Sequence, residues 1–251
     1  MQIYRIAETV VPMRKEPSHR AEMVNEILYG EDIAILENHN GWLSITCLDY
    51  NYCGFIPEIT KLNEISDKCI SPFKFVFTAS SLIRSEEGLK LDLPRGSRVR
   101  DEKTEKGCFE TPDIIKSLSE ITKTAKFYMG NPYRWGGRTP FGIDCSGFTQ
   151  MVFMLNRMII PRDAGQQVLL GSDVAFVSEA QGGDLAFFQN ENGEVIHTGI
   201  MLNNYEIIHA SGRVRIDKIY HHGIFNSELN KYTHTLKIIK RMDIDTLPKC
   251  L

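Results

Sequence analysis

The sequence predicts an α+β protein in which small strand-rich domains precede a domain of mixed helices and strands. In residues 1–62, short strands such as 32–36 and 42–46 are separated by a turn at 38–41. From Ile114 the apolar residues recur at helical spacing, and a second helical pattern follows Cys145. Three further strands are predicted after residue 182, and two of them form a hairpin.

The strand-rich front of the chain is predicted to contain two domains. Residues 1–62 have the strand and turn pattern of a small β-barrel. Residues 63–112 repeat that order of strands and turns less clearly. The interval from Arg84 to Gly96 is shorter than the corresponding interval from Arg14 to Gly30. A second, abbreviated barrel is therefore expected there. The third domain, 113–251, should open with a helix capped by Asp113.

The composition is that of an ordinary globular protein. The 251 residues are 42% hydrophobic, and 29 basic against 32 acidic side chains give a net charge of −3. No basic block interrupts the chain, which argues against nucleic acid as a partner. No apolar run approaches the roughly eighteen residues of a membrane span, which argues against a membrane partner. Residues 1–8 lack the features of a secretory signal, so we expect a cytoplasmic location.

The cysteines are scattered along the chain, without a C-x-x-C pair or a regular framework. Zinc sites and secreted disulfide scaffolds show tighter spacing, so reduced thiols are expected. We accordingly expect no metal and no cofactor. The six residues are Cys47, Cys53, Cys69, Cys108, Cys145 and Cys250.

Cys145 is the candidate nucleophile. A loop-like Pro-Phe-Gly segment at 140–142 precedes it, and apolar residues at helical spacing follow it as far as Ile159. Cys145 is therefore expected at a helix N-terminus, where unpaired amides and the helix dipole favour thiolate over thiol. The same amides, including that of Cys145, could hold an oxyanion.

Two histidines are the candidate partners of this cysteine. Strands at 195–201 and 206–211 are linked by a predicted turn at 202–205. A hairpin centred on Asn203 makes His197 and His209 direct cross-strand neighbours on one face. Because the residue numbers 197 and 209 are both odd, pairing the two histidines on one face requires a loop with an odd number of residues, or a bulge in one strand. The other histidines, His234 among them, are expected to lie outside this group.

Six short motifs follow one another between residues 133 and 210. They are Tyr-Arg-Trp-Gly-Gly at 133–137, Asp-Cys-Ser-Gly-Phe at 144–148, Pro-Arg-Asp at 161–163, Gly-Asp-Leu at 183–185, His-Thr-Gly-Ile at 197–200 and Ile-His-Ala at 208–210. In this order they resemble the NlpC/P60 cysteine peptidases over roughly residues 113–240. Segments 11–14, 28–31, 41–42 and 54–57 resemble the bacterial SH3 domains of cell-wall hydrolases. Together they are similar to γ-D-glutamyl-L-diamino acid endopeptidases, which cut cell-wall stem peptides.

The resemblance implies a papain-like α+β catalytic domain preceded by one or two small SH3-like β-barrels. It implies hydrolysis of the amide between D-Glu and the following diamino acid, with a small muropeptide as substrate. Cys145 would attack, His197 would transfer the proton, and His209 would orient His197. The residues expected to line the substrate site are Tyr133, Trp135, Asp144 and Ser146. Trp135 could instead be a core residue, and Arg162-Asp163 a surface ion pair.

The first barrel is expected to close one end of the cleft. The motif that matches the cleft-facing tyrosine of the similar enzymes contains Tyr52. A substrate ammonium group also needs a negative partner, which Glu22 or Glu26 could supply. Free peptide fragments in murein recycling are then the expected substrate, given the expected location.

Two other classes of function stay open at this point. One is a different reaction on the same fold, by an amidase, an acyltransferase or a lipid hydrolase. The other is a non-catalytic protein that binds cell-wall peptides. A probe that labels Cys145 in preference to the other cysteines would favour an enzyme over a binding protein.

Overall fold

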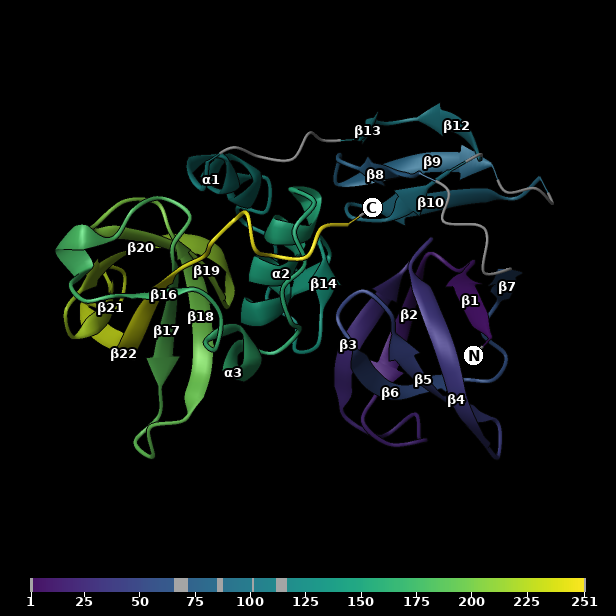
Figure 1. Cartoon of the computed structure of the whole chain (residues 1–251), viewed down its shortest axis with the longest axis horizontal. Coiled ribbons are helices and arrows are strands. Elements are labelled where there is room, and N and C mark those ends of the chain that lie inside the picture. Colours follow the sequence, from purple (N-terminus) through teal and green to yellow (C-terminus); the bar gives the residue numbers. More distant parts are fainter. Residues whose placement is uncertain (1, 66–71, 85–87, 101, 112–116, 251) are drawn as a thin grey trace. The chain divides into compact units, whose positions relative to one another are not determined.

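A computed structural model of the chain describes residues 2–65, 72–84, 88–100, 102–111 and 117–250 (Figure 1). The chain divides into two compact units. The first is Met1–Pro112 with Trp135–Pro140, and the second is Asp113–Arg134 with Phe141–Cys250. The segment at 135–140, which the sequence places in the third domain, thus belongs to the first unit.

The first unit begins with a seven-stranded antiparallel sheet in the order β3-β2-β6-β5-β4-β1-β7. Strands β4 and β5 are joined by a two-residue turn in which Asn40 and Gly41 both have positive φ, of 44° and 86°. Asparagine and glycine adopt this left-handed conformation most easily, which explains the predicted turn at 38–41. The strands are β1 Ile3–Ile6, β2 Val10–Arg14, β3 Met23–Leu28, β4 Asp32–His39, β5 Trp42–Cys47, β6 Tyr52–Pro57 and β7 Leu62–Ile65.

Two small sheets follow, in the orders β10-β9-β12 and β11-β8-β13. Their shared core contains Val76, Ile83, Leu93 and Val99, and Tyr29, in the turn after β3, packs into it. The strands agree with a second strand-rich module, whose SH3-like identity stays a prediction. They are β8 Lys74–Val76, β9 Ser80–Arg84, β10 Lys90–Pro94, β11 Arg98–Val99, β12 Lys103–Lys106 and β13 Phe109–Glu110.

Arg138, in strand β14 (Arg138–Thr139), is fully buried in the first unit. Its guanidinium donates to both carboxylate oxygens of Glu31 at 2.9 Å. It also donates to the carbonyl oxygen of Glu26 at 2.8 Å and to the Tyr50 hydroxyl at 3.0 Å. Such a bidentate pair satisfies two charges that would otherwise be buried without a partner. Arg138 thus secures the segment at 135–140 within the first unit.

We expect Arg138→Met to destabilise the first unit by about 3 kcal/mol, because the substitution leaves the Glu31 carboxylate buried and uncompensated. Both tryptophans of the chain, Trp42 and Trp135, lie in this unit, so their fluorescence reports its unfolding in urea. The double variant Arg138→Met/Glu31→Gln is the control, and it should recover part of the loss. An unchanged urea midpoint for Arg138→Met would contradict this role.

The second unit is built on a closed antiparallel sheet. The strand order is β16-β22-β17-β18-β19-β20-β21, and β21 also pairs with β22, so six strands form a barrel. Its apolar core includes Phe188, Met201 and Ile207. The strands are β16 Ser172–Val174, β17 Leu185–Gln189, β18 Val195–Met201, β19 Glu206–Ser211, β20 Arg213–Tyr220, β21 Gly223–Asn226 and β22 Lys231–Arg241, and a short strand β15 spans Gly142–Ile143.

Among the described residues, three α-helices accompany this barrel: α1 Ser119–Lys126, α2 Cys145–Leu155 and α3 Ala164–Gln167. Helix α1 lies within the predicted helical pattern, whereas its predicted cap Asp113 lies outside the described residues. Every residue of α2 is buried. Helix α2 ends at Leu155 rather than near Ile159, since Arg157 takes a left-handed φ of 62°.

No helix formed by the described residues combines the length and apolar character needed to cross a membrane. The described cysteines are free thiols, and Cys69 lies outside the described residues.

Candidate active site

Cys145 is the first residue of α2, as its sequence context predicts. The preceding residue, Asp144, has an extended backbone and caps the helix, accepting a hydrogen bond from the Gly147 amide at 2.6 Å. The Cys145 side chain is buried, with 6% exposure, and its sulfur is close enough to accept from the backbone amides of Thr198 and Ser146. Because Thr198 follows His197 in β18, the thiol lies beside the strand that bears the candidate base.

The environment of Cys145 does not favour a resting thiolate. Burial raises the pKa of the thiol to about 12, and the Asp144 carboxylate adds to this effect. The backbone amides of Thr198 and Ser146 and the Arg162 guanidinium lower the pKa of the thiol, but by less than burial raises it. The Ser146 amide at the helix terminus thus acts in the expected direction, toward thiolate, but desolvation of the buried thiol exceeds its effect.

His197 and His209 lie in the two strands of the predicted hairpin. Leu202 and Glu206 close a three-residue loop through a backbone hydrogen bond of 2.8 Å, so the predicted odd-numbered loop is confirmed. The register is shifted by two residues from the predicted one, and His209 faces Gly199 rather than His197. The prediction that the two histidines are direct cross-strand neighbours is therefore wrong.

The two histidine rings nevertheless meet along the diagonal of the hairpin. His197 Nε2 and His209 Nδ1 are 2.8 Å apart. Gly199 makes this possible, because a Cβ atom at this position would lie 2.7 Å from the Cβ of His209. A larger residue at 199 would displace the His209 side chain, so the absence of a side chain there permits the contact.

Asp217, in β20, contacts the ring nitrogen of His209 that is not bonded to His197. Its Oδ2 is 3.0 Å from His209 Nε2, and its Oδ1 accepts from Arg215 Nη2 at 2.9 Å. Burial alone would raise the pKa of Asp217, but its contacts with His209 and Arg215 outweigh burial and lower that pKa. Asp217 is thus an ionised acceptor in the second unit.

This arrangement determines which ring nitrogens carry protons. An ionised Asp217 requires a proton on His209 Nε2. Burial lowers the pKa of His209, so the ring is neutral and its Nδ1 accepts. His197 must then donate through Nε2, and its Nδ1 keeps the lone pair. Nδ1 of His197 is therefore the nitrogen available to take a proton from Cys145.

A third histidine belongs to this group. The His234 ring, from β22, stacks on the His197 ring with centroids 4.2 Å apart and an interplanar angle of 26°. Phe188, from β17, also contacts the His197 ring, with the two ring centroids 5.7 Å apart. The expectation that His234 lies outside the group is wrong, because barrel closure brings β22 beside β17. Burial lowers the pKa of His234 to about 4, with a further contribution from His209.

Asp144 and Ser146 flank the nucleophile and share a buried partner, Arg162. The guanidinium donates to Asp144 Oδ1 at 3.0 Å and Oδ2 at 2.5 Å, and to Ser146 Oγ at 3.0 Å. Arg162 is 1% exposed, so the alternative of a surface ion pair with Asp163 is wrong. Tyr133 is half-buried, and burial raises the pKa of its hydroxyl, with smaller contributions from the neighbouring Cys145 and Asp144 side chains.

Comparison with protein families identifies both parts of the chain. The model described as "NlpC/P60 family" matches residues 130–233. The model described as "Bacterial dipeptidyl-peptidase Sh3 domain" matches residues 13–59. The first match contains Cys145, His197, His209 and Asp217, and it ends one residue before His234.

An Escherichia coli protein named "Probable endopeptidase NlpC" is 35% identical over 116 residues, which are 43% of this chain and 74% of that protein. This chain belongs to the NlpC/P60 family. A "Gamma-D-glutamyl-L-lysine dipeptidyl-peptidase" from Bacillus cereus is 26% identical over 226 residues, which are 75% of this chain and 67% of the relative.

A solved structure shares the fold of this chain. The crystal structure of an NlpC/P60 family protein from Bacillus cereus superposes with a TM-score of 0.78, at 20% identity, and covers 95% of this chain and 99% of that one. The predicted α+β fold class, with an SH3-like strand domain in front of an NlpC/P60 domain, is confirmed.

Three of the predicted substrate residues of this NlpC/P60 protein lie in its first unit. Trp135 is 59% exposed, so it is not a core residue, and its indole nitrogen donates to Glu22 at 2.7 Å. Glu22 is exposed, whereas Glu26 is buried and accepts the amide of Arg138. Of the two acids, Glu22 is thus the one open to a ligand. Tyr52 is half-buried, and the roles of Glu22, Trp135 and Tyr52 at the substrate stay predictions.

We expect His234→Ala to move the acidic limb of the kcat/KM pH profile upward. Burial lowers the pKa of His197 well below its usual range, and His209 and His234 lower it further. Loss of the stacked ring admits water and removes one of these contributions, so the pKa of His197 rises. Since the neutral ring is the base, a higher pKa restricts activity to higher pH. A His222→Ala control, at an exposed histidine, should leave the limb in place.

Proposed function

We propose that this chain is a cysteine peptidase that hydrolyses the amide between the γ-carboxyl group of D-glutamate and a following diamino acid in cell-wall stem peptides. The observation that carries the proposal is the hydrogen-bonded series from His197 through His209 to Asp217, beside the Cys145 thiol. The substrate class is taken from the relatives, one of which is named a γ-D-glutamyl-L-lysine dipeptidyl-peptidase.

In the first step the Cys145 sulfur forms a bond with the carbonyl carbon, and the thiol proton passes to Nδ1 of His197. Because burial raises the thiol pKa and lowers the imidazole pKa, the resting pair is neutral. The proton therefore moves as the sulfur attacks, with His197 acting as a general base. The amide of Cys145, at the start of α2, is suited to hold the oxyanion.

The imidazolium that forms is stabilised through His209 and Asp217. His197 Nε2–H donates to His209 Nδ1, and the negative charge of Asp217 lies at the end of the series. His197 then returns its proton to the leaving amine as the C–N bond breaks, leaving a thioester on Cys145. A water molecule deprotonated by His197 hydrolyses the thioester and restores the thiol.

The direct test is incubation of the protein with L-Ala-γ-D-Glu-L-Lys and with L-Ala-γ-D-Glu-meso-diaminopimelate, with products identified by mass spectrometry. We expect the dipeptide L-Ala-D-Glu and the free diamino acid. A matched α-linked peptide, L-Ala-α-D-Glu-L-Lys, should be a poor substrate. If the protein cleaves neither of the two γ-linked peptides, the proposal is contradicted.

The proposal includes a requirement for a free amino terminus, with Tyr52 and Glu22 as its recognition residues. Glu22 is exposed, and it carries the negative charge that an ammonium group requires. We expect N-acetylation of the peptide to lower kcat/KM on the order of a hundredfold, because it removes the charge and adds bulk. Glu22→Gln should reduce this discrimination. Equal cleavage of free and acetylated peptides would remove both residues from the proposed site.

A requirement for a free amino terminus would direct the enzyme to small fragments rather than intact murein. We therefore propose a role in recycling of murein peptides in the cytoplasm. Fractionation of cells that produce the protein, with an antibody against the chain, tests the location.

A further inference from the structure

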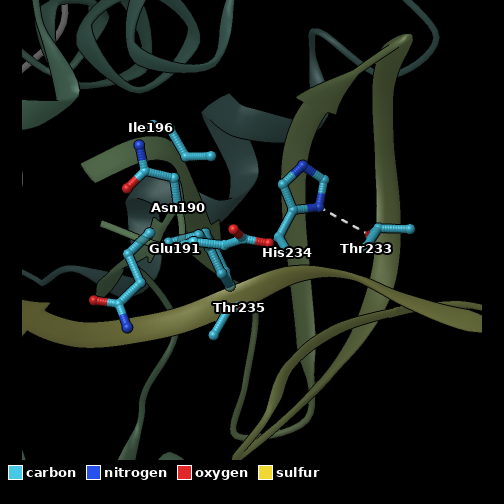
Figure 2. A pocket seen from close by; sticks show the side chains of 8 residues that line it. Asn190, Glu191, Ile196, Thr233, His234 and Thr235 are labelled. Atoms are coloured by element: carbon cyan, nitrogen blue, oxygen red, sulfur yellow. Dashed lines mark hydrogen bonds between the residues drawn. The ribbon is translucent and has the colours of Figure 1, made fainter. Parts of the chain in front are cut away.

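The His234 ring forms part of the wall of a pocket of about 300 Å³, where β17, β18 and β22 meet (Figure 2). The same ring stacks on that of His197, with the two centroids 4.2 Å apart. His234 therefore separates the pocket from the proposed base. Its ring is packed by the base on one side and borders the open space of the pocket elsewhere.

The proposed reaction requires the His197 ring to keep one orientation. Its Nε2 must donate to His209, and its Nδ1 must take the proton of Cys145. Rotation of a histidine ring about its Cβ–Cγ bond has broad, roughly two-fold preferences, so an unrestrained ring also adopts the flipped orientation. In that orientation ring carbons replace both nitrogens. The hydrogen bond to His209 restrains one edge of the ring, and packing must restrain its plane.

His234 is well placed to restrain the plane of the His197 ring. Its interplanar angle with that ring is 26°, whereas Phe188 and His209 meet the same ring at 46° and 83°. A nearly parallel ring at 4.2 Å opposes rotation of its neighbour, because rotation would drive an edge of the imidazole into it. The edge of His209 also contacts the His234 ring, with centroids 5.6 Å apart. His234 thus packs on both members of the hydrogen-bonded pair.

The His234 ring is held in turn by the preceding residue, Thr233. Thr233 Oγ1 and His234 Nδ1 are 2.9 Å apart, and Figure 2 shows this hydrogen bond as a dashed line. Since part of the His234 ring borders the space of the pocket, packing alone does not fix its plane. The hydrogen bond supplies a further restraint at one ring nitrogen.

We propose that His234 is a positioning residue, whose ring holds His197 in the orientation that presents Nδ1 to Cys145, and that Thr233 fixes the ring of His234. The inference rests on the proposed function, because His197 is the base of that reaction. The planar ring of His234 carries this role, and not its basicity. Burial lowers the pKa of His234 to about 4, so the ring is uncharged at neutral pH.

The test compares His234→Phe, which keeps a planar ring, with His234→Leu, which keeps an apolar side chain without a ring. The kcat and KM for L-Ala-γ-D-Glu-L-Lys are measured above the acidic limb of the pH profile, so that a shift in the pKa of His197 does not enter. We expect His234→Phe to retain about half of the native kcat and His234→Leu to lose about tenfold, as for one aromatic pair. KM should stay within about twofold in both variants, because His234 acts on the base. The pocket leaves space for the larger phenyl ring.

Thr233→Val should lower kcat about threefold, as for the loss of one hydrogen bond. Thr235→Val is the matched control and should keep the native kcat. Thr235 lies in the same strand and lines the same pocket, whereas the hydrogen bond to the His234 ring comes from Thr233. Circular dichroism verifies that each variant is folded. If His234→Leu does not fold, His234→Ala takes its place with the same expected loss of kcat.

Equal kcat values for His234→Phe and His234→Leu, whether native or reduced, would overturn the inference and leave the proposed function intact. A loss in His234→Leu that appears in KM instead of kcat would do the same. Equal kcat values for Thr233→Val and Thr235→Val would overturn the role of Thr233. A native protein that cleaves neither γ-linked peptide would overturn the proposed function, and this inference with it.

Discussion

Cys145→Ala is expected to lower kcat by a factor on the order of ten thousand or more while leaving the fold unchanged. A methyl group offers no lone pair for attack on the carbonyl carbon, and the proton acceptor His197 cannot replace it. The volume removed is one sulfur atom at the start of a buried helix, so a large loss of stability is not expected. Steady-state cleavage of the γ-linked lysine peptide, together with circular dichroism, measures both effects.

The matched control is Cys53→Ala, since Cys53 is an exposed free thiol in the first unit. This variant should keep the activity of the native protein. An electrophile built on the L-Ala-γ-D-Glu peptide should label Cys145, whereas a simple alkylating agent should not prefer this buried thiol with its raised pKa. Turnover by Cys145→Ala within about tenfold of the native rate would refute the mechanism.

The position of Cys145 could be predicted from the sequence because its determinants are local. A loop-like Pro-Phe-Gly segment followed by apolar residues at helical spacing is enough to place a helix start. The effective pKa of the thiol could not be predicted in the same way. It depends on burial, which other elements of the fold create, and burial exceeds the effect of the helix terminus.

The histidine hairpin was predicted in its strands and loop parity but not in its register. The register depends on Asn203, whose Oδ1 accepts from the amides of Tyr205 and Glu206 at 2.9 Å and so fixes a three-residue loop. Several loops are compatible with such a sequence, and each gives a different cross-strand partner. Gly199, opposite His209, is the local signal that favours the observed diagonal contact.

Asp217 and His234 carry no comparable signal in the sequence. Asp217 reaches His209 only through the pairing of β19 with β20, and His234 reaches His197 only through closure of the barrel by β22. Both contacts depend on registers between strands that are not fixed by residue spacing along one strand. Residues that support the nucleophile and its base are therefore harder to find from sequence than the nucleophile itself.

Asp217→Asn is expected to lower kcat on the order of a thousandfold, with a smaller effect on KM. Arg215 contacts both carboxylate oxygens of Asp217, Oδ1 through Nη2 at 2.9 Å and Oδ2 through Nε at 2.7 Å, and the first of these contacts is the one with hydrogen-bond geometry. An asparagine should therefore keep its oxygen at the Oδ1 position and turn its amide nitrogen to His209. His209 Nε2 must then accept, and its proton moves to Nδ1. His209 can no longer accept from His197 Nε2–H, so His197 holds its proton on Nδ1, the nitrogen that should receive the proton of Cys145. A wrong tautomer of this kind, in an otherwise intact site, has a large cost in other enzymes.

Nitrogen NMR of the imidazoles distinguishes this effect from a general loss of structure, because the proton should appear on Nδ1 of His209 only in the variant. The matched control is Glu228→Gln, since Glu228 contacts Arg215 on its exposed side and not His209, and it should retain nearly native kcat. His209→Ala, which lets water take the place of the ring, should be milder than Asp217→Asn, because water can accept from His197 Nε2–H and preserve the productive tautomer. A native kcat for Asp217→Asn, or an unchanged His209 tautomer with a large loss of activity, would show that Asp217 does not act through His209.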